Sequence, residues 1–156
     1  MAATYTAEHY TANLDIRTVV HNPADAATAQ FIDLARPKAG TTQCLAIEGY
    51  RRFFASITTT ILVGTGPTVF ELYAATSAAG GGKIVIASHA MGSLPNALND
   101  SVVLECDVAQ VREVLSTATH IGVWLDCQHN DDEVACTFIR GEPFYPVAGL
   151  TADYVS

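Results

Sequence analysis

Apolar and polar residues alternate along much of the chain after residue 44, and a period of two predicts β-strands. The alternation is clearest in 121–127 (IGVWLDC) and in 68–76 (TVFELYAAT). A third segment, 53–63, is rich in Thr and Ile, which favour strands. We predict further strands at 14–20, 45–50, 83–88, 101–106 and 134–140.

The same alternation predicts which face each side chain occupies. In 53–63 we expect Ile57, Ile61 and Val63 on one face and Thr58 and Thr60 on the other. The single Trp124 falls on the opposite face from its apolar neighbours. It is either core for a second layer or an anchor in a protein interface, where aromatic residues are enriched.

Two helices interrupt the strand pattern. The run Asn22-Pro23-Ala24-Asp25 is a helix-start signal for 26–35, and Pro37 stops that helix. Asp107 caps a second helix over 108–116, which carries an apolar stripe.

These elements predict a mainly β fold. We expect an antiparallel β-sandwich or barrel of about seven or eight strands with two short helices. Two hairpins are expected: 68–76 with 83–88, joined at Gly80-Gly81-Gly82, and 121–127 with 134–140. The alternative is an α+β fold in which 101–127 forms one βαβ crossover. Residues 1–22 are expected to form an N-terminal arm or edge strand, and 23–156 a single β-rich domain.

Charge is almost absent from the middle of the chain. Between Phe53 and Asn99 only Glu71 and Lys83 are ionised. A 156-residue domain has a large surface, which normally carries charge, so one fold can hide only part of this segment. The sequence therefore predicts a protein that assembles with other chains. The candidate interface residues are Tyr50, Arg51, Arg52, Phe53, Thr58, Thr60, Ala75 and Trp124.

The net charge of −8 arises in the last third of the chain, where ten acids face two arginines. Such a surface repels phosphate and excludes direct binding of nucleic acid. The acids either keep the domain soluble or mark an outward face. No apolar run is long enough to span a membrane and no secretion signal is recognisable, so we expect the protein in the cytosol of the cell that makes it.

No motif for catalysis or cofactor binding emerges. Gly64-x-Gly66 follows a strand as a phosphate-binding turn would, but Pro67 removes an N–H donor, which favours a simple turn. No histidine pairs with a recognisable nucleophile. The sequence predicts no enzyme, no cofactor and no metal site.

The densest group of possible metal ligands lies in 127–136, with Cys127, His129, three acids and Cys136. Their spacing matches neither a zinc knuckle nor an EF-hand loop. If the chain turns at Asp131-Asp132, the two cysteines face each other as buried thiols or, when oxidised, as a disulfide. All four cysteines are expected to be small buried hydrophobes.

The runs VGTGPTVFELYAATSAAGGGKIVIASHAMGSLPNALNDSVVLECDV (63–108) and FIRGEPFYPVAGLTADYVS (138–156) resemble small virion proteins of tailed bacteriophages. These are β-sandwich proteins that decorate or cement a capsid shell, and more distantly head–tail connector proteins. The resemblance carries no site residue. It implies a non-catalytic structural protein on the capsid surface, with other copies of itself, often as a trimer, and a major capsid protein as partners.

Two alternatives of other classes stay open. One is a β-barrel that binds a small ligand in a cavity lined by residues such as Phe70, Tyr73, Ile86 and Trp124. The other is a metal-dependent hydrolase that uses 127–136. If the protein is a virion structural protein, we expect it to have no small-molecule substrate.

Overall fold

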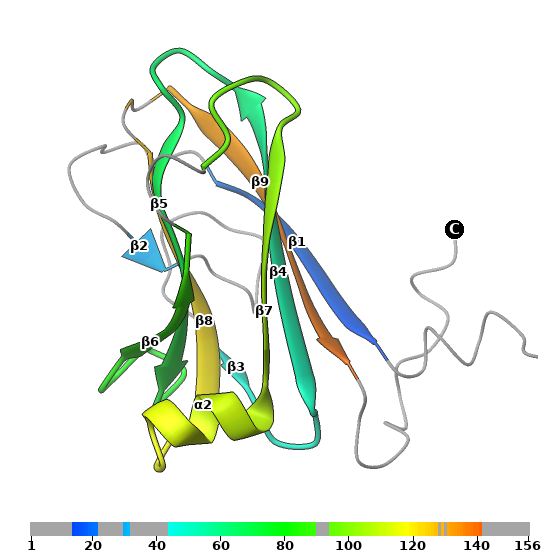
Figure 1. The fold of residues 1–156 in the computed structure, drawn as a ribbon, viewed down its shortest axis with the longest axis vertical. Coiled ribbons are helices and arrows are strands. Elements are labelled where there is room, and N and C mark those ends of the chain that lie inside the picture. Colours follow the sequence, from blue (N-terminus) through cyan, green and yellow to red (C-terminus); the bar gives the residue numbers. More distant parts are fainter. Residues whose placement is uncertain are drawn as a thin grey trace, which may run out of the picture.

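A computed structural model shows two antiparallel β-sheets packed face to face (Figure 1). It describes residues 14–21, 30–31, 44–89, 94–127, 129 and 131–141. The elements are β1 (Asp15–His21), β2 (Gln30–Phe31), β3 (Leu45–Ala46), β4 (Arg52–Ile61), β5 (Pro67–Ala75), β6 (Ile84–Ser88), β7 (Ser101–Asp107), α2 (Val108–Val114), β8 (His120–Cys127) and β9 (Glu133–Gly141).

Sheet A has the order β1-β9-β4-β7, and sheet B has the order β2-β8-β5-β6, with β3 also paired to β8. Every pair is antiparallel. When β3 is left aside, β5 and β6 are the one pair of consecutive described strands that share a sheet. Every other step along the described strands crosses from one sheet to the other. This winding is the jelly roll, in which eight strands form two Greek keys. The predicted antiparallel sandwich is confirmed, and so is the hairpin of β5 and β6.

The core lies between the two sheets and consists of alternate residues from each strand. Its largest fully buried side chains are Phe53, Phe70, Phe138, Ile57, Leu72, Ile121, Leu125, Val111 and Val123. In 121–127 the apolar neighbours of Trp124 are buried, in agreement with the predicted alternation, and buried residues alternate in the same way in 68–74 and 102–106. In β4 the inner face is Phe53, Ala55, Ile57 and Thr59.

The predicted face of two residues near the end of the 53–63 segment is wrong. Ile61 and Val63 are exposed rather than buried with Ile57. A register shift between Thr59 and Ile61 rotates the chain, and β4 ends there. The predicted strand over 45–50 is also shorter than expected, because β3 stops at Ala46.

Two predicted connections are wrong for one common reason. Strands β7 and β8, joined by α2, lie in different sheets, so they form no βαβ crossover. Strands β8 and β9 also lie in different sheets, so they are not a hairpin, and Cys127 and Cys136 do not face each other across one. In both places the chain crosses the sandwich instead of returning along the same sheet.

The N-terminal predictions are partly tested. The strand predicted at 14–20 is β1, an edge of sheet A that pairs with β9. The helix predicted over 26–35 is wrong at Gln30–Phe31, which pair with β8 as β2; the rest of that range lies outside the described residues. So do residues 1–13 and the tail from 142. Within the described ranges α2 is the one helix, and none is long and apolar enough to cross a membrane.

Helix α2 closes one end of the sandwich (Figure 1). Asp107 caps it as predicted: its side chain accepts a hydrogen bond from the Gln110 N–H at 2.8 Å, and the Gln110 side chain accepts one from the Asp107 N–H at 2.9 Å. Val111 is buried and anchors the helix to the core. We call this the α2 end; the opposite end, formed by loops 62–66 and 94–100 and residues 129, 131 and 132, is the loop end.

Candidate functional site

The outward side of sheet A is a regular surface built from four strands. Three rows cross its four strands in the order β1, β9, β4, β7. We call these twelve positions the sheet A face. They are Ile16, Ile139, Phe54 and Glu105; Thr18, Thr137, Ser56 and Val103; and Val20, Ala135, Thr58 and Ser101.

The sheet A face carries one charge, Glu105 on the edge strand β7. Ile16, Val20 and Val103 are 40%, 52% and 43% exposed. No described helix or strand packs across these rows. The face is therefore an apolar and neutral surface that the described part of the chain leaves open.

Hydroxyl groups on the sheet A face satisfy one another across strands. The Thr58 and Ser101 hydroxyl oxygens lie 2.7 Å apart, and those of Thr18 and Thr137 lie 3.2 Å apart. In each pair one hydroxyl donates to the other, and such cross-strand pairs stabilise the sheet.

A pocket of about 520 Å³ lies where the sheet A face meets the α2 end. Phe54, Ile139 and Leu14 give it apolar walls. Arg52, Glu105, Asp107 and Gln110 are its polar walls.

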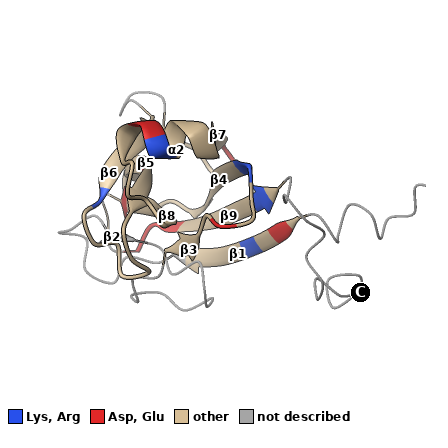
Figure 2. Cartoon of the chain, turned by 90° about the horizontal axis from the view of Figure 1, so that it is seen from below, with Lys and Arg blue, Asp and Glu red and all other residues tan. Residues whose placement is uncertain are grey.

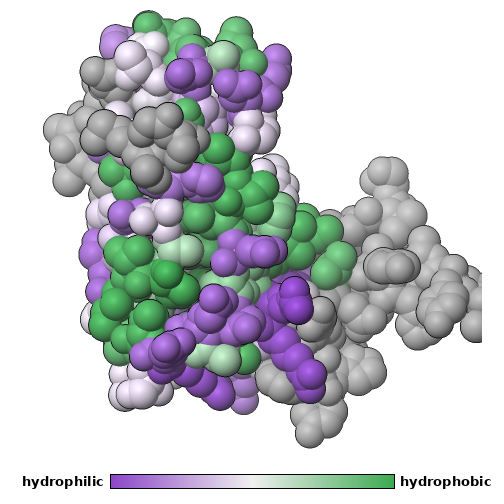
Figure 3. Space-filling model, in the orientation of Figure 1, coloured by the Kyte–Doolittle hydropathy of each residue, from purple (hydrophilic) through white to green (hydrophobic). Residues whose placement is uncertain are grey.

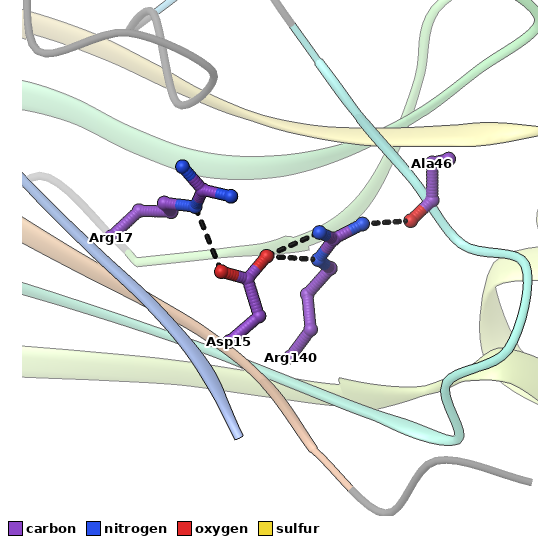
Figure 4. Close-up of polar contacts among 4 residues, drawn as sticks. All are labelled: Asp15, Arg17, Ala46 and Arg140. Carbon is purple, nitrogen blue, oxygen red and sulfur yellow. Dashed lines mark hydrogen bonds and ion pairs between the residues drawn. The ribbon is translucent and has the colours of Figure 1, made fainter. Parts of the chain in front are cut away.

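The α2 end is held together by a buried ion-pair cluster (Figure 4). Asp15 is 1% exposed. It accepts a hydrogen bond from Arg17 Nε at 2.8 Å and from Arg140 Nε at 2.9 Å, and Arg140 Nη2 donates to the same carboxylate. Arg140 also donates to the Ala46 carbonyl at 2.7 Å. The cluster therefore links β1 and β9 of sheet A to β3 of sheet B.

The loop end is organised by another buried carboxylate, Asp132. It accepts backbone N–H donors from Val63 at 2.6 Å, Gly64 at 2.8 Å, Gly66 at 3.2 Å and His129 at 3.3 Å. Burial raises the pKa of Asp132, but the four N–H groups together outweigh it, so its pKa lies below the ordinary value. The glycine turn that resembled a phosphate cradle thus binds a side chain of its own protein.

The predicted interface residues divide into three groups. Arg52, Thr58 and Thr60 lie together on the outward side of β4, and Arg51 is exposed just before that strand. Trp124 lies on the outer side of sheet B, 5.8 Å from the Tyr73 ring, with Lys83 Nζ 3.1 Å above its ring centre. The structure thus leaves five of the eight candidates accessible on two different sides of the molecule.

The other three candidates are buried, which corrects their assignment: Phe53 and Tyr50 belong to the main core, and Ala75 belongs to a small separate cluster with Cys44. Phe53 is 1% exposed and stacks on Phe138 with ring centres 6.5 Å apart. Ala75 is fully buried, and Tyr50 is buried beneath the Arg140 guanidinium at 4.4 Å. Their side chains are covered by the protein's own fold.

The possible ligand group in 127–136 is dispersed. Cys127 and Cys136 are buried in different sheets and Asp132 is engaged by backbone donors. In the described ranges no group of three or more His, Cys, Asp and Glu is placed to hold a metal ion. All four cysteines are free thiols, buried as predicted, and burial raises the pKa of each to about 12.

The cavity expected for a small-ligand barrel does not form. Phe70 is fully buried in the core, whereas Tyr73 and Trp124 pack on the outer side of sheet B. These side chains therefore cannot line one common cavity. The pocket beside α2 is made by other residues.

Hydrophobic surface also gathers over β6 and beside β7 in the view of Figure 3. Ile84 and Val85 of β6 are 42% and 38% exposed. Sequence reasoning placed these residues in a strand without assigning them to a surface. Sequence reasoning also missed the β1 and β9 contributions to the sheet A face, because only the strand order brings them beside Thr58.

Neither family models nor curated protein sequences give a match to this chain. Among solved structures, the chain is similar to the PRD1 vertex protein P5, with a TM-score of 0.43 and 15% identity over 82% of this chain and 97% of that chain. It is also similar to the Tobacco streak virus coat protein, with a TM-score of 0.37 and 9% identity over 92% and 95% of the two chains. By their titles the first is a vertex protein and the second is a virus coat protein.

Proposed function

We propose that this protein is a non-catalytic structural subunit of a virion, which binds other shell subunits through the sheet A face. The observation that carries the proposal is the composition of that face: eleven of its twelve outward positions are uncharged, and no described element covers them. A surface of this kind on a protein with a net charge of −8 is typical of a protein–protein contact.

The fold is compatible with this role and does not determine it. Jelly rolls serve viral capsids, lectins and cupins, so function has to be argued from the surface. In the finer form of the proposal, the protein decorates or cements a capsid of a tailed phage, binds between capsid subunits and stabilises the shell. A head–tail connector is the second form of the same class.

The size of the sheet A face sets the strength of the contact. Neighbouring strands lie about 4.8 Å apart and outward residues about 6.8 Å apart along a strand, so twelve positions cover about 400 Å². A standard interface buries about 800 Å² on each partner. One such face therefore supports weak pairwise association, which suits a subunit that makes several contacts in a shell.

The decisive experiment measures self-association of the full chain by sedimentation at increasing concentration. We expect the mean mass of the parent protein to rise with concentration, and Thr58→Glu and Val103→Glu to prevent the rise by burying a charge in the contact. Thr117→Glu is the matched control, because Thr117 is exposed in the turn after α2. Circular dichroism verifies that each variant is folded.

Two outcomes would contradict the proposal. One is a parent protein that stays monomeric at every concentration; the other is face variants that associate as well as the control. The genomic setting tests the virion assignment independently. A major capsid gene beside this gene would support it, and a metabolic operon would count against it.

A further inference from the structure

Two aromatic rings form a corner on the outer side of sheet B. The ring centres of Tyr73 and Trp124 lie 5.8 Å apart, and their planes are tilted by 57°. Both side chains are half-buried, and they pack against the buried pair Cys44 and Ala75. The rings are therefore two walls on a packed floor, and part of each ring stays accessible. We call this pair of rings the aromatic corner.

The aromatic corner already holds an ammonium group. Lys83 Nζ lies 3.1 Å above the ring centre of Trp124 and 5.5 Å from that of Tyr73. A cation within about 6 Å of a ring centre is attracted by the negative face of the ring. The Lys83 residue is exposed, so the corner is reached from solvent. The protein thus shows, in its own side chain, the kind of group that the corner binds.

The charges around the corner favour a cation. Glu71 lies directly across from Trp124 in the pairing of β5 with β8, and its carboxylate accepts a hydrogen bond from the Tyr73 hydroxyl at 2.6 Å. Among the described residues, Lys83 is the one Lys or Arg that belongs to the sheet B part of the chain. Figure 2 shows this separation, with one basic position beside β6 and the others toward α2 and sheet A. Without the Lys83 ammonium, the corner would therefore be left beside an acid.

The Lys83 ammonium can leave the corner. It is carried by a flexible four-carbon stem, and a primary ammonium is strongly hydrated in water. A quaternary ammonium has the same charge but is hydrated more weakly, and its methyl groups can contact both rings at once. Aromatic walls are the usual means by which proteins recognise such groups.

We propose that the aromatic corner binds a quaternary ammonium group, which takes the place of the Lys83 ammonium between Trp124 and Tyr73. Choline and trimethylated lysine side chains carry such a group. Lys83 is a tethered competitor, and a short tether gives an effective concentration in the millimolar range, so the parent protein binds weakly. The corner and the sheet A face lie on different sheets, so this inference goes beyond the proposed function and does not depend on it.

The fluorescence of Trp124 tests the proposal, because Trp124 is the one tryptophan of the chain. The full chain is titrated with choline chloride at constant ionic strength. We expect a saturable change in the parent protein and binding about tenfold tighter in Lys83→Ala, which lacks the competitor. Arg112→Ala is the matched control, since it removes the same charge from an exposed position on α2 and should bind as the parent does. Lys83→Gln replaces Lys83→Ala if that variant is unfolded by circular dichroism.

A neutral analogue separates attraction of the charge from apolar contact. The compound 3,3-dimethyl-1-butanol has the shape of choline, with carbon in place of nitrogen. In Lys83→Ala we expect it to bind about tenfold more weakly than choline, and Tyr73→Leu in the same background to weaken choline binding by a similar factor. Phosphocholine and free trimethyllysine then distinguish a lipid headgroup from a modified protein side chain. Saturable binding of either supports the site, and the tighter of the two identifies the source.

Three results would overturn the inference. They are no saturable change in Lys83→Ala, equal binding of choline and its neutral analogue, and equal affinity of the parent and Lys83→Ala for choline. The proposed function is judged separately, by the association of Thr58→Glu and Val103→Glu, because those two residues lie on sheet A.

Discussion

At the level of single residues, Asp132 has a structural role that its neighbours in the sequence do not reveal. In the sequence it is one acid in the run Asn130-Asp131-Asp132-Glu133. In the fold it is fully buried, and four backbone N–H groups from two loops converge on its carboxylate. It joins the turn between β4 and β5 to the connection between β8 and β9.

Replacement of Asp132 by Asn tests this role. The amide turns one acceptor into a donor that faces backbone N–H groups, so we expect Asp132→Asn to lower the free energy of unfolding by about 2 kcal/mol at pH 7. The neighbouring Asp131→Asn is the control, because Asp131 is exposed. Urea denaturation of both variants measures the difference.

The pH dependence follows from the pKa of the same carboxyl group. The pKa of Asp132 is lower in the folded protein than its ordinary value of 3.8. Its stabilising contribution is therefore complete above that value and is lost as the pH falls through the folded pKa. The difference between parent and Asp132→Asn should stay constant from pH 7 to about 5 and shrink at about pH 3. A difference independent of pH would contradict this assignment.

Single residues also show where sequence reasoning stops. The alternation in β4 correctly set Thr58 and Thr60 on the outward side, since pleating fixes which neighbours share a face. It could not show that Phe53 is enclosed, because its enclosure depends on the second sheet, or that Ala75 is buried, because Cys44 from a distant segment belongs to the same cluster. It also could not show that Asp132 binds the Gly64 turn, since these residues lie far apart in the chain.

At the level of elements, strands were predictable and their partners were not. The segments 121–127 and 134–140 have the alternation of a hairpin, and a short polar link joins them. That pattern is the same whether the chain reverses within a sheet or crosses to the other sheet. Here Asp132 ties the link to the β4–β5 loop, and β9 lies in sheet A. Such long-range contacts cannot be read from the alternation of one segment.

The capping of α2 gives a prediction at the same level. Asp107 and Gln110 form a reciprocal capping box, and the helix has only seven residues. A short helix depends strongly on its cap, so Asp107→Ala should lower the free energy of unfolding by about 1 kcal/mol, and Asp107→Ser by less. Glu113→Ala, on the exposed side of α2, is the control. Equal losses for Asp107→Ala and Glu113→Ala in urea denaturation would show that the cap contributes little.

At the level of the whole molecule, the sheet A face exists only because four distant segments become neighbours. The sequence predicted that the nearly uncharged middle of the chain is covered by other chains, and most of β4 lies in that segment. Strands β1 and β9 come from segments with ordinary charge, yet their outward residues complete the neutral rows. Charged residues of these strands are turned inward or placed at the ends, as Asp15 and Arg140 show. Surface character is therefore a property of topology as much as of composition.

The four buried cysteines report whether both sheets unfold as one unit. Cys106, Cys127 and Cys136 belong to one continuous core cluster that spans sheets A and B, whereas Cys44 belongs to a small separate cluster on the outer side of sheet B. Burial and a pKa of about 12 protect each thiol from alkylation in the native state.

We therefore expect alkylation in increasing urea, followed by mass spectrometry, to modify Cys106, Cys127 and Cys136 in one common transition. Cys44 should react at lower urea, because opening its cluster leaves the main core intact. Alkylation under fully denaturing conditions supplies the control for intrinsic reactivity. If Cys127 of sheet B became reactive well before Cys136 of sheet A, the two sheets would open separately. The sheet A face would then belong to a layer that can separate from the sandwich, and a contact through it would not require the whole jelly roll to be folded.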